Sequence, residues 1–315
     1  MREVERSVRS GPPKRGVIMA LTTAGVVGLL VVAVVMIAPA TRSGEIGAAP
    51  RRTTTATVST SPSPRPPLGV NTAIPRRVQP LKARLLFGAQ SLAADIVKGI
   101  PLAFSSAHIA KPKITSWNRA MNIRGPLVAT AKIGNNGNPR SKLRAFAELV
   151  NDAPRGSVDV ALMAFSYQDI TAETDVERLF DDYAETMESI QSANPDILFL
   201  YATTPVSTAN SWRAVDQTTV MGLRDVDQPV WQDNIARERL NSFIRDQYGP
   251  TGRLFDIAAL QARIGSGKVA AKIHETQYYY VMNPELSSDG KQLNKRGSTQ
   301  LADALMRLLA TARKI

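Results

Sequence analysis

A serine stands directly after a short apolar run, at the start of a helix-like segment. Ser91 closes the turn Gly88-Ala89-Gln90-Ser91, which follows Leu85-Leu86-Phe87. A serine hydroxyl attacks an ester when a general base takes its proton, a carboxylate orients that base and hydrogen-bond donors stabilise the oxyanion. Ser91 is therefore a candidate nucleophile. The structural alternative is that it only caps the helix that begins there.

A second chemically suggestive segment lies just before the last helical pattern. It runs Ser288-Asp289-Gly290-Lys291-Gln292-Leu293-Asn294, with Asp289 three residues ahead of Gln292. A carboxylate at that spacing could orient a base, but a glutamine amide has no pKa near 7 and cannot accept a proton from serine. Asp289 and Asn294 have a structural alternative as turn and cap residues.

Together the two segments resemble the SGNH/GDSL hydrolase superfamily, whose nucleophilic serine lies at such a first turn. In that family a late Asp-x-x-His segment supplies the rest of the triad. The chain is most similar to a branch with Phe-Gly-His-Gln-Ser at the first turn and Asp-Gly-Gly-His-Leu-Asn at the last. The resemblance implies Ser91 as the nucleophile and Asp289 as the triad carboxylate, with Gln292 at the position of the histidine. Because Ala89 also replaces a histidine of that branch, the active site is expected to be degenerate.

The resemblance also implies where the oxyanion and substrate contacts should lie. Gly134 and Asn136, in the segment Lys132–Pro139, fall on the block that supplies donors to the oxyanion. Gln168, in Ser166-Tyr167-Gln168-Asp169, falls on the Gly-x-Asn-Asp block. The likeness extends over residues 84–312 and includes 234–241 and 254–258.

The two histidines of the chain, His108 and His274, are the other candidates for a general base. Either would need to bring its imidazole within about 3 Å of the serine hydroxyl. The alternative for each is an ordinary loop or surface histidine.

Strand-like and helix-like runs alternate from residue 84 onward. Apolar runs predict strands at 85–87, 158–165, 197–203 and 253–257. Helical patterns cover 91–99, 174–193 with a capping box at Thr174 and Glu177, 232–248 and 297–313. Strands that are apolar on both faces indicate a parallel sheet covered on both sides. The predicted fold is a three-layer αβα sandwich with a mainly parallel sheet, similar to SGNH and flavodoxin-like folds, preceded by one transmembrane helix.

The charge of the chain is concentrated before the predicted domain. Residues 1–82 hold 12 Lys and Arg against 3 Asp and Glu, whereas residues 83–315 hold 27 against 24. A nucleic-acid-binding domain carries clustered positive charge on its own surface, so no nucleic-acid partner is expected. The chain has no cysteine, which excludes disulfides and thiol chemistry. No metal-ligand spacing stands out, and no cofactor is expected.

The N-terminal region predicts export. Residues 1–16 form a basic tail, and the 24 residues Val17–Ala40 carry no charge, enough for about 36 Å of helix. An uncleaved anchor with a cytoplasmic N-terminus is favoured by this length and by the preceding arginines. A signal peptide cleaved after Ala40 is the alternative. Residues 41–82, with 7 Pro and 11 Ser or Thr, predict a disordered linker to the domain at 83–315.

Two functions are expected from these observations. The first is a membrane-tethered extracytoplasmic hydrolase that removes acyl or acetyl groups from a cell-envelope glycan or lipid, weakly because of Gln292. The alternative is a non-catalytic relative that binds cell-wall glycan or a partner enzyme. The sequence does not specify the acyl group, the polymer or the oligomeric state.

Overall fold

The structure is a computed structural model that describes residues 77–120, 125–208, 228–264, 268–274 and 277–312. The basic tail, the apolar segment Val17–Ala40 and most of the predicted linker lie outside these residues. Within the described ranges, no helix is both long and apolar enough to cross a membrane. Val78, near the end of the predicted linker, is buried against the folded part.

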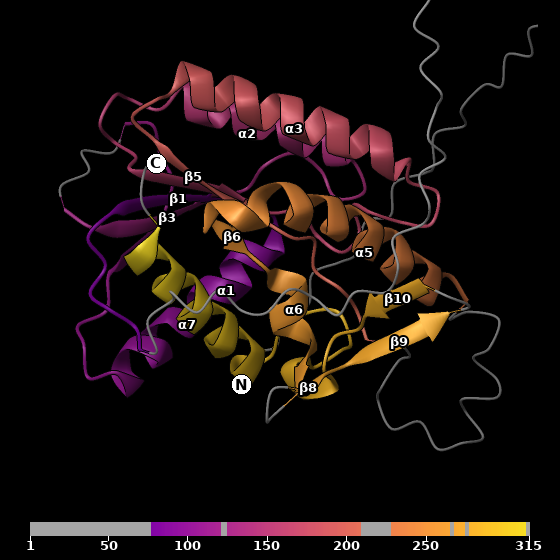
Figure 1. Cartoon of the computed structure of the whole chain (residues 1–315). Coiled ribbons are helices and arrows are strands. Elements are labelled where there is room, and N and C mark those ends of the chain that lie inside the picture. Colours follow the sequence, from indigo (N-terminus) through magenta and orange to yellow (C-terminus); the bar gives the residue numbers. More distant parts are fainter. Residues whose placement is uncertain (1–76, 121–124, 209–227, 265–267, 275–276, 313–315) are drawn as a thin grey trace, which may run out of the picture. The chain divides into compact units, whose positions relative to one another are not determined.

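Six parallel strands form the central sheet, in the order β2-β3-β1-β4-β5-β6 (Figure 1). Their bounds are Arg84–Gly88 for β1, Lys113–Ser116 for β2, Leu127–Ala131 for β3, Val160–Met163 for β4, Leu198–Ala202 for β5 and Leu254–Phe255 for β6. The first strand therefore lies in the middle, between β3 and β4. The chain adds strands on one side of β1 and then on the other, so the C-terminal end of β1 is the point where the strand order reverses.

Helices cover both faces of the sheet, as Figure 1 shows. On one face lie α1 (Ser91–Ser106), α6 (Ile257–Ala262) and α7 (Lys295–Thr311), and on the other lie α2 (Pro139–Asn151), α3 (Val176–Ala193) and α5 (Gln228–Tyr248). Crossovers between parallel strands are right-handed. Reversing the direction of strand addition at β1 therefore moves the connecting helices to the opposite face.

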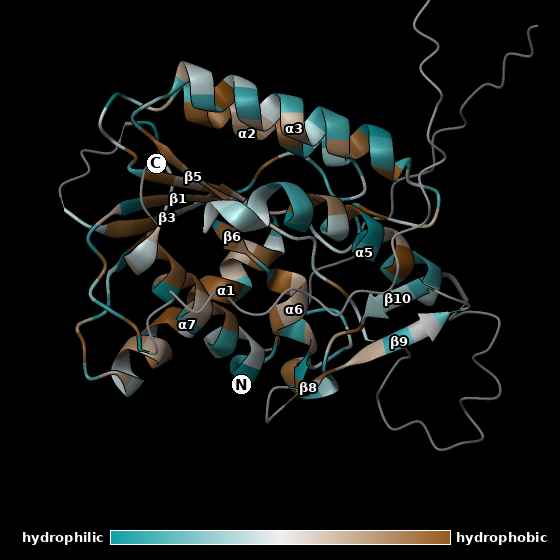
Figure 2. Ribbon diagram, in the orientation of Figure 1, coloured by the Kyte–Doolittle hydropathy of each residue, from teal (hydrophilic) through white to brown (hydrophobic). Residues whose placement is uncertain are grey.

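The strands are apolar on both faces because each face packs on a helical layer. Leu85 and Phe87 of β1 belong to the core under α1 and α7, whereas Leu86 between them belongs to the core under α2 and α3. β5 alternates in the same way. Figure 2 shows hydrophobic strands between helices whose outer faces are hydrophilic. The predicted αβα layering and parallel sheet are confirmed.

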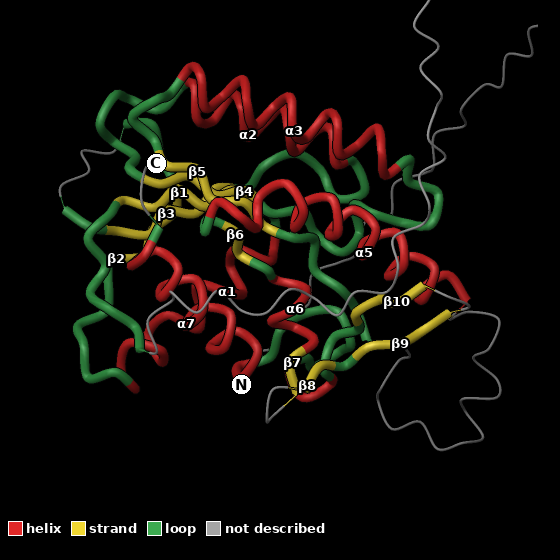
Figure 3. The backbone as a smooth tube through the Cα atoms, viewed as in Figure 1, coloured by secondary structure: helices red, strands yellow, loops and turns green. Residues whose placement is uncertain are grey.

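Smaller elements follow α6 and were not predicted. They are β7 (Arg263–Ile264), β8 (Lys268–Val269), β9 (Ala271–His274), β10 (Gln277–Tyr280) and the 3₁₀ turn η2 (Pro284–Leu286); another 3₁₀ turn, η1 (Gly249–Thr251), precedes α6. β9 and β10 form an antiparallel hairpin beside α5, apart from the main sheet (Figure 3).

Several predicted helix ends differ from the structure: α5 begins at Gln228 rather than at 232, and α7 spans Lys295–Thr311 rather than 297–313. The first helix was expected to stop at Gly99 but continues through Pro101 to Ser106. Gly99 lies where α1 crosses α7 so closely that a Cβ on it would stand 2.1 Å from the carbonyl oxygen of Ser298. The cap of α3 is Asp175, whose carboxylate accepts from the backbone N–H of Arg178, rather than the expected Thr174.

Candidate functional site

Four polar segments meet at the C-terminal edge of the sheet. They follow β1, β3, β4 and η2, and hold residues 89–91, 132–138, 164–169 and 287–294 respectively. In open parallel sheets, ligands bind beyond the carboxyl ends of the strands where the strand order reverses. Every residue expected from the sequence to form the site lies in one of these segments.

Ser91 is the first residue of α1 and its side chain is exposed. The N-cap position belongs to Gln90, so Ser91 is not the cap that the structural alternative supposed. The side-chain amide of Gln90 donates to the carbonyl oxygen of Ile133 at 2.8 Å and to that of Gly134. This contact brings the Ser91 turn against the segment after β3. At the start of a helix, backbone N–H groups and the macrodipole favour negative charge near the hydroxyl.

Gly134 and Asn136 lie in the turn that leads into α2. Gly134 has a φ of 48°, and a Cβ on it would stand 2.5 Å from the backbone nitrogen of Lys142. The side-chain oxygen of Asn136 accepts from Lys142 Nζ at 2.9 Å and from Ser166 Oγ at 3.1 Å. With that oxygen engaged, the amide nitrogen of this exposed residue is the end suited to donate to a ligand.

A buried ion pair fixes this turn to the segment after β4. Lys142 and Asp169 have fully buried side chains, with Nζ 2.5 Å from Oδ2. Asp169 also accepts from the backbone N–H groups of Gly137 at 2.9 Å and of Ser166 at 2.6 Å. Burial lowers the pKa of Lys142, while its hydrogen bond to Asp169 opposes that shift. Lys142 was not among the residues expected from the sequence. Lys142 repeats at helical spacing with Phe146 and Val150, which are buried on α2. This spacing was the sequence signal that Lys142 lies on the inner face of that helix.

Tyr167 connects the segment after β4 to the late turn. Its ring lies 5.9 Å from the guanidinium carbon of Arg237 and 6.0 Å from Lys291 Nζ. Burial, and then the nearby carboxylate of Asp289, raise the pKa of Tyr167, while Arg237 lowers it. Gln168, the next residue, is exposed at the same edge.

Arg237 is buried under this contact. Its guanidinium donates to Asn234 Oδ1 at 2.8 Å, to Ser207 Oγ at 3.2 Å and to the carbonyl oxygen of Ile170 at 3.2 Å. Burial lowers its pKa to about 10, and Asp233 is the main group that opposes this shift. The guanidinium therefore stays charged at neutral pH and holds the segments after β4 and β5 together.

Two amides of α5 support the segment after β5. The side chain of Asn234 accepts from the N–H of Ser207 at 3.1 Å and donates to its carbonyl at 3.0 Å. Asn241 bonds Thr204 in the same way, at 2.6 and 3.0 Å. The resemblance over residues 234–241 thus falls on side chains that shape the edge of the sheet.

The Asp289 carboxylate binds its own turn. Its Oδ1 accepts from the backbone N–H of Gln292 at 2.6 Å and of Lys291 at 2.9 Å. Burial acts to raise the pKa of Asp289, but these backbone donors outweigh it and the pKa is lowered. Gln292 is exposed, and Asp289 contacts its backbone rather than its side chain. In the described part of the chain, no hydrogen bond joins Ser91 to Asp289 or Gln292. Asn294 caps α7 through a bond from the N–H of Gly297 at 3.0 Å.

Neither histidine is placed as a base for Ser91 by any contact among the described residues. His108 follows the C-terminal end of α1, whereas Ser91 begins this helix of 16 residues, which is about 24 Å long. His274 is an exposed residue of β9 whose ring lies 4.0 Å from that of Trp231. Ala89 is 1% exposed, so the histidine that it replaces in the similar branch would meet the core here.

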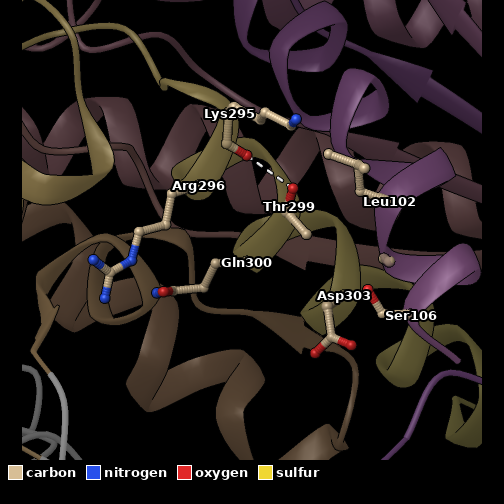
Figure 4. Close-up of a pocket in the computed structure, with 8 residues that line it drawn as sticks. Leu102, Ser106, Lys295, Arg296, Thr299, Gln300 and Asp303 are labelled. Atoms are coloured by element: carbon tan, nitrogen blue, oxygen red, sulfur yellow. Dashed lines mark hydrogen bonds between the residues drawn. The ribbon is translucent and has the colours of Figure 1, made fainter.

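A surface hollow of about 700 Å³ lies elsewhere, between α1 and α7 (Figure 4). Its polar side chains are largely engaged: Arg296 pairs with Glu285, Thr299 bonds the carbonyl of Lys295, and Gln300 bonds the carbonyl of Leu260. Leu102, on its α1 side, stands 11 residues after Ser91, about 16 Å along the helix. The hollow is therefore separate from the candidate site. Among the described residues, no group of three or more His, Asp or Glu is arranged to hold a metal ion.

No family model and no curated protein matches this chain. Among solved structures, it is similar to a GDSL-like lipase from Bacteroides thetaiotaomicron, at 13% identity and a TM-score of 0.45, over 73% of this chain and 89% of that one. A lipase/acylhydrolase from Enterococcus faecalis matches at 12% identity and a TM-score of 0.43, over 74% and 100%. The periplasmic domain of a lipopolysaccharide acetyltransferase from Salmonella ser. Paratyphi A matches at 15% and 0.42, over 71% and 82%. These proteins are similar to this chain at low identity over most of its length.

Proposed function

We propose that the folded domain binds acyl esters at the C-terminal edge of its sheet and hydrolyses them weakly or not at all. The observation that carries this proposal is an exposed Ser91 at a helix N-terminus, among donor-bearing turns, with no base in contact with it among the described residues. Gln292 occupies the position expected for the base. The carboxylate that would orient a base, that of Asp289, accepts hydrogen bonds from the backbone N–H groups of Lys291 and Gln292. The donors at this edge are suited to hold an ester carbonyl. Among the described residues, no general base is placed to take the proton of the Ser91 hydroxyl.

The size of the catalytic defect follows from what the base does. It removes the hydroxyl proton as oxygen attacks the acyl carbon, and returns that proton to the leaving alcohol. In serine proteases the loss of the base removes about 10⁶ in turnover, roughly 8 kcal/mol of barrier lowering. Oxyanion donors alone leave about 10³ to 10⁴ over the uncatalysed reaction.

The proposed ligand is an acyl or acetyl ester of a cell-envelope glycan or lipid. Support comes from the sequence: Val17–Ala40 is long enough to span a bilayer, and the Pro- and Thr-rich residues 41–82 would hold the domain away from it. The proposal places the N-terminus in the cytoplasm and the domain outside, at the cell membrane, or secreted if the chain is cleaved after Ala40.

The test is hydrolysis of p-nitrophenyl acetate by the purified full-length chain, beside Ser91→Ala, Gln292→His and the double variant. We expect wild type to exceed Ser91→Ala only slightly. Gln292→His should raise turnover, and the double variant should abolish the gain, because the new imidazole acts only through the serine. Efficient turnover by wild type that Ser91→Ala removes would contradict the proposal and point to a base elsewhere, with His274 the first to replace.

A further inference from the structure

A cavity of about 560 Å³ opens beside the late turn, between the β9–β10 hairpin and residues 287–290. We call it the hairpin cavity. Its apolar lining consists of Ile264, Ala270, Ala271, Val281, Met282 and Pro284. A volume between about 300 and 1,000 Å³ with a mainly apolar lining is typical of small-molecule sites.

Several polar groups of the lining are already engaged within the protein, whereas Lys272, an exposed residue of the lining, brings an ammonium group to it. The backbone N–H of Val281 donates to Ala270 at 3.1 Å, and that of Met282 donates to Ser207 at 3.0 Å. The amide of Asn283 bonds main-chain groups with both of its ends, and Glu285 pairs with an arginine of α7. A polar ligand would find few free partners there, so the lining favours a hydrocarbon.

One wall exposes an apolar side chain to solvent. Ile264 is 41% exposed, and Leu102 is the other large hydrophobic residue of the described ranges that is similarly exposed. Met282, which also lines the hairpin cavity, is 1% exposed. A hydrocarbon chain lying against Ile264 would remove its exposed surface from water, which is favourable in proportion to the apolar area covered.

The hairpin cavity adjoins the candidate site through the turn that they share. Ser287, Ser288 and Gly290 line the cavity, while Asp289 and Lys291 of the same turn face Tyr167 at the edge of the sheet. The N–H of Thr208 donates to the carbonyl of Gly290 at 2.9 Å and fixes this turn to the segment after β5. The turn of residues 287–291 is therefore common to the hairpin cavity and the candidate site.

We infer that the hairpin cavity receives the hydrocarbon chain of the bound acyl group, so that the preferred ligand carries an acyl chain longer than acetyl. This inference rests on the proposed function for the ester end of the ligand. It assigns the chain end to Ile264, Ala271 and Met282.

The test uses straight-chain carboxylates from acetate to decanoate, which carry the chain without the ester. They are titrated into the full-length chain in lipid nanodiscs, labelled with ¹³C at methionine methyl groups, and the Met282 signal is assigned with Met282→Leu. We expect that signal to shift saturably from butanoate upward, with Kd falling about fourfold for each added methylene until the cavity is full.

Two variants and a control locate the effect. Ala271→Phe fills the cavity and should abolish the chain-length dependence, whereas Ala310→Phe adds the same side chain at an exposed position of α7 and should keep it. Ile264→Ser changes an exposed side chain without endangering the fold, and should weaken octanoate binding roughly tenfold. An unchanged Met282 signal, a Kd independent of chain length, or a dependence that Ala271→Phe retains would overturn the inference.

Ser91→Ala separates this inference from the proposed function. Carboxylate binding in the cavity should be the same with and without the serine hydroxyl. If esters fail to bind at the sheet edge while carboxylates still fill the cavity, the proposed function fails alone. If acetate esters bind but wild type shows no preference for longer chains, or Ala271→Phe keeps that preference, the cavity assignment fails alone.

Discussion

The Asp289 carboxylate accepts hydrogen bonds from its own turn instead of orienting a general base. Its lowered pKa means that the folded state binds the proton less tightly than the unfolded chain, because two backbone N–H groups stabilise the ionised form. That stabilisation is present above the unfolded pKa of about 3.9 and is lost as pH falls through the lower folded value. The charge therefore supports the late turn at neutral pH.

Replacing Asp289 with Asn tests this role. We expect wild type to melt at a higher temperature than Asp289→Asn at pH 6, and the difference to shrink below about pH 4, as the wild-type carboxylate becomes protonated. Thermal unfolding by circular dichroism from pH 6 to pH 2.5 measures it. Asp246→Asn, at an exposed position of α5, is the control and should show little pH-dependent difference. A difference that stays constant down to pH 2.5 would show that the charge does not matter.

The ion pair between Lys142 and Asp169 makes a larger prediction. Lys142→Met leaves a carboxylate fully buried without its cation, which costs about 3–5 kcal/mol of unfolding free energy. Urea denaturation should show this loss, and adding Asp169→Asn should recover part of it. The control is Arg119→Met, which breaks an exposed pair with Asp152 and should cost less than about 1 kcal/mol. Equal losses in the two single variants would refute the assigned role.

The segments expected from the resemblance adjoin one another at the sheet edge, whereas the residues that support them were not foreseen. Ser91, Gly134, Asn136, Gln168 and Asp289 lie in the segments that the resemblance indicated. Lys142 was missed because lysine is usually exposed, and only its apolar helical neighbours indicate otherwise. The backbone partners of Asp289 depend on the geometry of the turn, which residue types do not specify.

At the scale of elements, the crossing of α1 and α7 demands a glycine. Gly99→Ala would place a methyl group 2.1 Å from the backbone oxygen of Ser298, so one helix must move. We expect a loss of about 1–3 kcal/mol or more in urea denaturation, despite the higher helix propensity of alanine. Gly249→Ala is the matched control, because nothing lies within 4 Å of its added Cβ, and its effect should be within about 0.5 kcal/mol. Similar stabilities of the two variants would contradict the close crossing.

The same helix shows why its end was predicted wrongly. Gly99 and Pro101 are both poor helix formers, so local propensity favours a stop there. The apolar residues Ile100, Ala103 and Phe104 continue the buried face of α1, and their burial outweighs that propensity. α3 was predicted more accurately because Leu179, Tyr183, Met187 and Ile190 repeat at helical spacing and are all buried. The β9–β10 hairpin has no comparable alternation and depends on contacts with α5.

At the scale of the whole molecule, the proposed anchor can be tested by deletion. We expect the full chain to sediment with membranes and to resist carbonate extraction, since about 24 apolar residues are long enough to span a bilayer. A variant lacking residues 17–40 should remain in the soluble fraction. A reporter enzyme that is active only outside the cytoplasm, fused after Ile315, should be active with the full chain and inactive with the deletion. The tether would be refuted if carbonate extracts the full chain completely from membranes and the reporter is inactive.

The central position of β1 has a consequence for how the chain is made. Both neighbours of this strand, β3 and β4, are synthesised after it, and β4 comes only after the whole of α2. Pairing between strands so distant in sequence requires closing long loops and is slow. A nascent chain halted before β4 therefore carries the apolar run Leu85-Leu86-Phe87 with one side unpaired, where it is prone to aggregate or to bind a chaperone. Only when β4 is complete does β1, the first strand synthesised, become an interior strand of the sheet.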